Sequence, residues 1–133
     1  MQTFMPMIEY RAALETLDDA RLNKQILEVT QLANAIMDPT AGYQHHPVTR
    51  MWRPHVLALL TYGISAAGAW ARRKRISSME RSASLYSRQV EIAKHLGPRR
   101  AAKSHQIPPW VGDVDFHESH RSNLIRKDPI HYN

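Results

Sequence analysis

Apolar residues recur at helical spacing along most of this chain, and this periodicity constrains its fold more than any other feature. The clearest stripe is Leu22, Ile26, Val29, Ala33 and Ile36, with successive spacings of four, three, four and three residues. Such spacing places all five side chains on one face of an α-helix. Alternating apolar and polar runs, which are typical of half-buried strands, are scarce. The pattern therefore predicts an all-α fold.

Capping and helix-breaking residues divide the chain into three to four main helices. The helix that carries the stripe is expected to begin after Asp18 or Asp19, either of which can cap it, and to stop at Asp38-Pro39. The other helices are expected over about 8–16, from Val48 or Pro54 to Arg72, and over about 77–96 and 115–127. The sequence thus predicts a compact bundle.

The helix expected over 77–96 has a less regular apolar pattern. Its inward positions are predicted to be Met79, Ala83, Tyr86, Val90 and Ala93. The following Gly97-Pro98 is expected to end it, because glycine favours a helix C-terminus and proline cannot continue a helix. A basic loop and the rigid segment 108–110 are then expected before the last helix.

Length and composition narrow the class of protein. A chain of 133 residues fits one domain, so we expect residues 1–133 to form a single helical unit, with a monomer favoured. Because cysteine is absent, disulfides and thiolate metal sites are excluded, and a cytoplasmic location is expected. The weakly polar stretch 56–71 is too short and too often interrupted for a membrane span, and the N-terminus lacks the pattern of a secretion signal. We therefore expect no membrane partner.

Positive charge is concentrated in the middle of the chain. Residues 50–112 hold twelve Lys and Arg but only two acids, whereas 1–49 and 113–133 carry net charges of −3 and −1. A basic block of this density suits a polyanion such as nucleic acid. A solvated basic surface that aids solubility explains the charge equally well.

One polar face of the helix that follows Asp18 offers a candidate catalytic group. Arg21, Lys24, Gln25, Glu28 and Gln31 lie on one side of this helix. With Lys24 one turn and Arg21 two turns away, the Glu28 carboxylate would be held ionised, ready to act as a general base or to stabilise a cation. The alternative is an exposed face with a simple Lys24–Glu28 pair, worth a few tenths of a kcal/mol.

Three other segments contain candidate contacts to phosphates or bases. The segment at the start of the helix expected from Val48 or Pro54 provides His46, Arg50, Trp52 and Arg53. The main electrostatic candidate is the run Arg72, Arg73, Lys74 and Arg75. The C-terminal candidates are Trp110, His120, Arg121, Arg126 and Lys127. A buried core position is the alternative for Trp52.

Histidines suggest one further alternative. A metal-dependent enzyme could use His45, His46, His117 and His120, but His45-His46 is not a helical ligand pair and no carboxylate motif accompanies it. We therefore expect neither a metal nor another cofactor.

Several short motifs occur in a recognisable order. They are LDDARLNKQILE at 17–28, His46-Pro47, Met51-Trp52 and SHRSNLIRKDPIHY at 119–132. With them the chain resembles the pyrimidine-dimer DNA glycosylase superfamily of phage endonuclease V-like enzymes, and more closely its small bacterial and phage relatives. The resemblance implies a compact helical fold that acts on double-stranded DNA.

The resemblance also implies site residues. The catalytic glutamate of the family falls on Glu28, and a basic or histidine position near the scissile nucleotide falls on Arg21. Basic positions of the last helix fall on Arg121 and Lys127. In this family the N-terminal α-amine attacks the sugar C1′ and forms an imine, which then eliminates the 3′ phosphate. Here Gln2 follows Met1 and is too large for ordinary methionine removal, so the amine would belong to Met1.

These observations give one leading hypothesis and one rival. The first is a DNA glycosylase, with or without AP-lyase activity, that extrudes a damaged or modified pyrimidine from the duplex. The rival is a non-catalytic nucleic-acid-binding or regulatory protein on the same helical scaffold.

Overall fold

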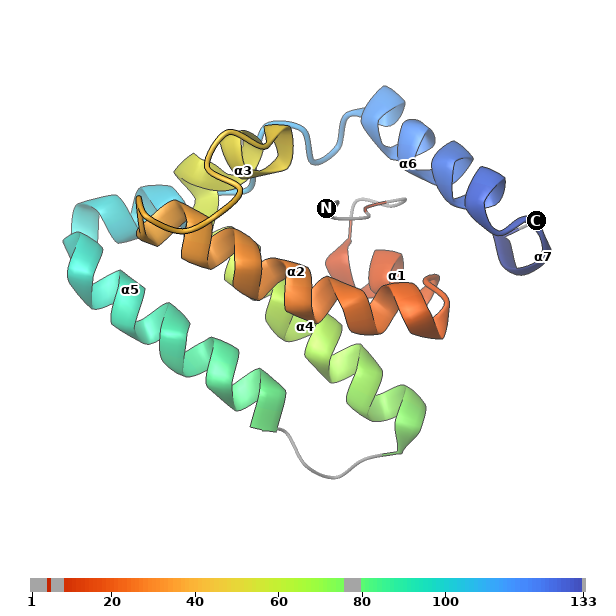
Figure 1. Ribbon diagram of the computed structural model, residues 1–133, viewed down its shortest axis with the longest axis horizontal. Coiled ribbons are helices and arrows are strands. Elements are labelled where there is room, and N and C mark those ends of the chain that lie inside the picture. Colours follow the sequence, from red (N-terminus) through yellow and green to blue (C-terminus); the bar gives the residue numbers. More distant parts are fainter. Residues whose placement is uncertain (1–4, 6–8, 76–79, 133) are drawn as a thin grey trace.

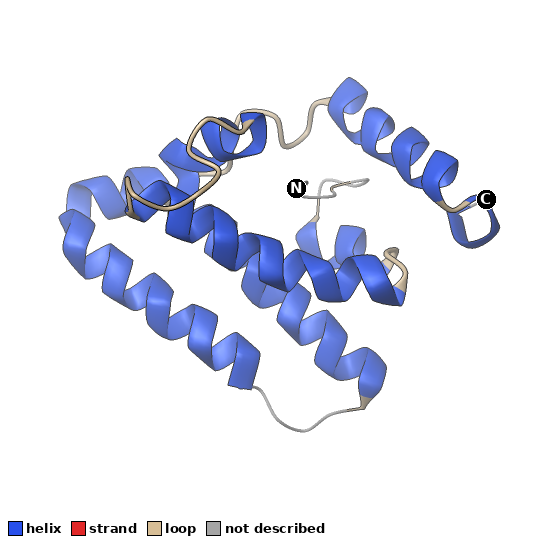
Figure 2. Ribbon diagram, viewed as in Figure 1, coloured by secondary structure: helices blue, strands red, loops and turns tan. Residues whose placement is uncertain are grey.

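The fold is a set of helices with the α2 and α4 pair at its centre (Figures 1 and 2). The computed structural model describes residues 5, 9–75 and 80–132. Within these residues every regular element is helical, which confirms the predicted all-α class. The elements are α1 (Tyr10–Glu15), α2 (Asp19–Met37), α3 (Pro47–Trp52), the 3₁₀ helix η1 (Arg53–His55), α4 (Val56–Lys74), α5 (Glu80–Ser104), α6 (Val114–Lys127) and α7 (Pro129–Tyr132).

The boundaries of α2 follow from its sequence as predicted. Asp18 caps the helix, because its carboxylate accepts a hydrogen bond from the backbone N–H of Arg21. The helix ends at Met37, before Asp38-Pro39. The core positions of its apolar stripe, among them Leu22, Val29 and Ala33, are buried.

A glycine sets the close approach of α2 and α4. A Cβ atom built on Gly63 would lie 2.6 Å from Cγ1 of Val29, closer than two carbon atoms can approach. The absence of a side chain at Gly63 therefore lets the two central helices pack closely.

The long helix expected from Val48 or Pro54 to Arg72 is divided in the structure. Residues 47–52 form α3, and the turn that contains Pro54 is the 3₁₀ helix η1. The continuous helix α4 begins only at Val56 and reaches Lys74.

The inward face predicted for α5 is wrong by one residue. Ser82, Leu85, Gln89 and Ile92 are buried, whereas Ala83 is exposed and Tyr86 is 60% exposed. The polar residue Gln89 accounts for this rotation, because its amide donates to the carbonyl of Leu57 and to Oγ1 of Thr61, each at 2.9 Å. A search for apolar periodicity cannot predict buried positions that are occupied by hydrogen-bonded polar residues. Met79 and the expected helix starts at 8 and 77 lie outside the described residues.

The prediction of a basic loop directly after Gly97-Pro98 is also wrong, because a second helical segment continues to Ser104. Gly97 interrupts α5 with φ 82° and ψ 166°, a left-handed conformation that favours glycine. Pro98 then begins a new helical segment, where its fixed φ and missing N–H are tolerated. This C-terminal arm of α5 (98–104) docks on the start of α4, because Oγ of Ser104 accepts the N–H of Leu57 at 3.0 Å.

The C-terminal part of the chain returns to the N-terminal part. The segment 108–110 precedes α6 as expected, and the Trp110 ring packs edge-on against Trp52 with ring centroids 5.1 Å apart. The short helix α7 was not predicted; its Tyr132 reaches Asp18 at the start of α2. No helix of the described residues is both long and apolar enough to cross a membrane.

Candidate active site

Glu28 is a buried carboxylate in the middle of α2. Glu28 is only 5% exposed. The alternative that this face of the helix is fully exposed to solvent therefore does not hold at Glu28. Nζ of the exposed Lys24 lies 3.8 Å from its Oε1 atom, which keeps a cation beside the carboxylate. A buried carboxylate with a neighbouring cation suits charge stabilisation or proton transfer.

A chain of buried polar groups holds Glu28 from the inside. The Gln25 amide donates to Oε2 of Glu28 at 3.2 Å, and the Tyr62 hydroxyl donates to Oε1 of Gln25 at 2.7 Å. Tyr62, on α4, is fully buried and packs edge-on against Tyr10. The carboxylate is thus oriented by a connection between α2 and α4. The sequence placed Gln25 on the correct face, but no pattern indicated Tyr62.

Two histidines of α6 hold the backbone of Met5. The Met5 N–H donates to Nδ1 of His120, and the Met5 carbonyl accepts from Nδ1 of His117, both at 2.7 Å. Met5 is fully buried. We call His117 and His120 the histidine clamp. Their spacing of three residues indicated one helical face, but nothing in the sequence identified Met5 as their partner.

The hydrogen bonds assign neutral tautomers to the clamp. Nε2 of His117 accepts the N–H of Gly112 at 2.9 Å, so its proton is on Nδ1 and points at the Met5 carbonyl. Nδ1 of His120 is an acceptor, so a neutral His120 carries its proton on Nε2. Burial, together with the nearby His117, lowers the pKa of His120 to about 4.

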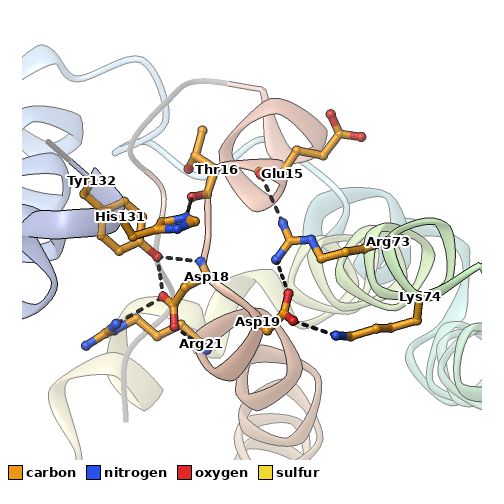
Figure 3. A network of polar contacts seen from close by, with 9 residues as sticks. All are labelled: Glu15, Thr16, Asp18, Asp19, Arg21, Arg73, Lys74, His131 and Tyr132. Atoms are coloured by element: carbon orange, nitrogen blue, oxygen red, sulfur yellow. Dashed lines mark hydrogen bonds and ion pairs between the residues drawn. The ribbon is translucent and has the colours of Figure 1, made fainter.

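Arg21 belongs to a polar network between α2 and α7 (Figure 3). Its guanidinium lies 3.0 Å from the Asp18 carboxylate and 4.0 Å from that of Asp128. The Tyr132 hydroxyl donates to the same Asp18 carboxylate and accepts the Asp18 N–H at 2.7 Å. Burial and the hydrogen bond to Asp18 raise the pKa of Tyr132 to about 12. Burial of Asp18 acts to raise its pKa, but hydrogen bonds from Tyr132 and Arg21 outweigh burial and lower it.

Most of the basic run at the end of α4 is paired with acids (Figure 3). Arg73 lies 3.1 Å from the Asp19 carboxylate, and Lys74 binds the same group. Arg72 lies 3.2 Å from the Glu15 carboxylate. Arg75 caps the helix in a left-handed conformation. The acidic N-terminal third therefore offsets part of the basic block, which reduces the charge that this run offers to DNA.

The aromatic candidates differ in their access to solvent. Trp52 is fully buried between Tyr62 and Trp110, so its expected role in stacking on a base is corrected to a core role. Trp110 is half-buried in the same aromatic cluster. Large aromatic surfaces are drawn into the core by the hydrophobic effect.

The remaining candidates lie on or near the surface, with one exception. His46 caps α3, because its Nδ1 accepts the N–H of Val48 at 3.1 Å. His120 is buried in the clamp, so its expected role in contacting DNA is corrected to one inside the protein. The exposed cations among the predicted DNA contacts, beyond Lys24 and the α4 run, are Arg50, Arg53, Arg121, Arg126 and Lys127.

Two hypotheses from the sequence remain: a metal site built from histidines and a nucleophilic α-amine at Met1. In the described part of the chain, no three His, Asp or Glu side chains are grouped as metal ligands. Met1 lies outside the described residues, so the catalytic role expected of its α-amine stays a prediction.

A comparison of sequences assigns this helical protein to a class of DNA glycosylases. The profile of the family described as pyrimidine dimer DNA glycosylase matches residues 1–96 of the 133. The chain belongs to this family. Membership gives it a DNA glycosylase-like function in general, with DNA as the substrate. No curated protein and no solved structure matches the chain.

Proposed function

We propose that this protein is a DNA glycosylase with AP-lyase activity that acts on a damaged or modified pyrimidine in duplex DNA. The observation that carries the proposal is the Glu28 carboxylate, which is buried and oriented by Gln25 and Tyr62 inside the region matched by the family. A carboxylate fixed in this way stabilises positive charge at a sugar C1′ without reorganising during the reaction. Proteins that bind DNA only through its phosphates do not need such a group.

The proposed nucleophile is the α-amine of Met1. Its lone pair forms a bond to C1′ while the base leaves with the electrons of the glycosidic bond. Opening of the sugar ring, with a proton passing from nitrogen to the ring oxygen, gives an imine. Loss of a C2′ proton then expels the 3′ phosphate. An α-amine with an ordinary pKa of about 7.7–8.0 is partly neutral near pH 7, as the first step requires.

The histidine clamp supports this proposal because it fixes the backbone near the amine. Four residues span at most about 14 Å when fully extended. Anchoring Met5 therefore keeps the amine within about this distance of the clamp.

Borohydride trapping on DNA that contains an abasic site tests the proposal. Wild-type protein should give a covalent adduct, and Glu28→Gln should lose most of it while retaining DNA binding. Glu91→Gln removes an exposed carboxylate on α5 and serves as the matched control, which should trap like wild type. Absence of a wild-type adduct would contradict the lyase step.

The rival function is a non-catalytic DNA-binding or regulatory protein on the same scaffold. It predicts salt-dependent DNA binding in both the wild type and Glu28→Gln, with no adduct and no base release from either. Base release by wild type without an adduct would instead indicate a glycosylase that lacks the lyase step.

A further inference from the structure

We propose that a cationic cleft beside the C-terminal arm of α5 binds a backbone phosphate of DNA, outside the site around Glu28. The cleft has a volume of about 560 Å³ and lies between the end of α2, η1 and this arm. Ile36, Val56 and Leu96 contribute apolar walls, and Arg53, Arg100 and Lys103 contribute positive charge. The proposal rests on DNA being the substrate, as the proposed function requires.

The charge of the cleft is not compensated within the described part of the chain. No carboxylate is among the described residues that line it. Arg100 and Lys103 make no ion pair with any described residue, unlike Arg72, Arg73 and Lys74 on α4. Low-dielectric walls around like charges focus a positive potential in the cleft. The complementary ligand is therefore an anion.

The cleft is also built with defined geometry. The guanidinium of Arg53 donates to the carbonyl of Gln44 at 2.9 Å, which orients its side chain. The turn at Gly97 redirects the chain, and Ser104 fastens the arm to the start of α4. Guanidinium groups bind phosphate oxygens through paired N–H donors, so two arginines and a lysine suit a phosphate better than a single carboxylate.

The cleft begins about two and a half turns of α2 beyond Glu28, counted along the helix axis. Met37, at the edge of the cleft, is nine positions after Glu28, which corresponds to a rise of about 13.5 Å along the axis of α2. Consecutive phosphates of one duplex strand advance about 3.4 Å along the axis, so this distance is on the order of four nucleotides. A phosphate in the cleft would thus belong to the DNA that flanks the target nucleotide.

Two neighbouring arginines make a sharp test of this proposal. Arg100 lines the cleft, whereas Arg99 is exposed beside it and does not. The affinity of wild type, Arg100→Gln and Arg99→Gln for a labelled duplex with a tetrahydrofuran abasic analogue is measured over a series of salt concentrations.

We expect Arg100→Gln to weaken binding about three- to tenfold near 0.1 M salt and to reduce the salt slope by about one. Arg99→Gln should change affinity less than twofold. Equal losses in the two variants would show a diffuse electrostatic attraction and would overturn the proposal, as would no loss in either. Melting temperatures of both variants should match wild type, because both side chains are exposed.

The length of the duplex tests where the cleft meets the DNA. The duplex is shortened to two base pairs beyond the abasic analogue, first on one side and then on the other. The Arg100→Gln penalty should disappear for one of the two short duplexes. A penalty that survives on both would contradict the assigned position. Neither binding experiment requires base release or imine formation, so failure of the trapping experiment is distinguishable from failure of this proposal.

Discussion

The backbone N–H of Met5 donates a 2.7 Å hydrogen bond to Nδ1 of His120, a residue 115 positions later in the chain. The acceptor must be unprotonated, and the low pKa of His120 keeps it so at neutral pH. His117 binds the carbonyl of the same residue. Both histidines lie beyond residue 96, where the family match ends, yet they hold a residue within it. The clamp thus joins the matched region to α6.

The clamp makes stability depend on pH. Burial lowers the pKa of His120 from its ordinary value of 6.5 to about 4, so the folded state binds fewer protons than the unfolded chain between these values. The free energy of unfolding should therefore fall as the pH is lowered from about 6.5 to 4, by roughly 3 kcal/mol from this group. Urea titrations across this range measure the loss. His120→Asn, which keeps an acceptor near the Nδ1 position but does not titrate, should flatten this part of the curve.

The clamp should also affect the proposed chemistry more than DNA binding. His120→Ala removes the acceptor for the Met5 N–H, so the N-terminal segment should be held less firmly. We expect borohydride trapping to slow by about tenfold or more, as a poorly positioned nucleophile would give. Affinity for the abasic analogue should change less than threefold, and His120→Asn should recover much of the trapping rate. If affinity and trapping fall in parallel, the histidine has a general structural role instead.

Tyr62 orients the candidate catalytic carboxylate through Gln25. Tyr62→Phe removes the 2.7 Å hydrogen bond to Gln25 with little change of shape. The variant should lose about 1–2 kcal/mol of stability, as expected for a buried hydrogen bond, and its trapping rate should fall at unchanged DNA affinity. Tyr86→Phe on the exposed side of α5 is the control and should match wild type in each measurement.

Gly63 should tolerate no side chain. In Gly63→Ala the new methyl group would meet Val29 at 2.6 Å, so we expect a loss of about 1–3 kcal/mol and a lower melting temperature. Gly68→Ala lies on the same helix, where the new Cβ would meet only the flexible end of Arg72 at 3.3 Å. That control should be neutral or stabilising by up to about 1 kcal/mol, because alanine favours the helix. Equal destabilisation by both would argue against close packing at Gly63.

Tyr132 should fasten α7 to the start of α2. In Tyr132→Phe the Asp18 carboxylate and N–H both lose their partner hydroxyl, and we expect a loss of about 1–2 kcal/mol. Amide exchange in α7 should rise more than exchange in α4. Tyr43→Phe, at an exposed loop position, should leave both unchanged.

The sequence alone determined the features that depend on local spacing. The stripe from Leu22 to Ile36 predicted α2, and Asp18 was one of the two residues predicted to cap it. The spacing also placed Gln25 and Glu28 on one face, where they form a hydrogen bond. These predictions succeeded because helix periodicity and capping involve residues only a few positions apart. The same reasoning failed in α5, where Gln89 is buried to bond Leu57 and Thr61 on another helix.

Only the tertiary structure decided how these faces are used. It placed Glu28 inside rather than in solvent, joined it to Tyr62, brought His117 and His120 to Met5, and paired the α4 cations with Glu15 and Asp19. Each of these contacts joins groups that are far apart in the chain. The burial of Glu28 depends on which residues pack over α2. Burial and long-range pairing are set by the packing of whole helices, so residue spacing cannot predict them. The sequence thus indicated candidate residues, and the packing determined which of them are buried and held by hydrogen bonds.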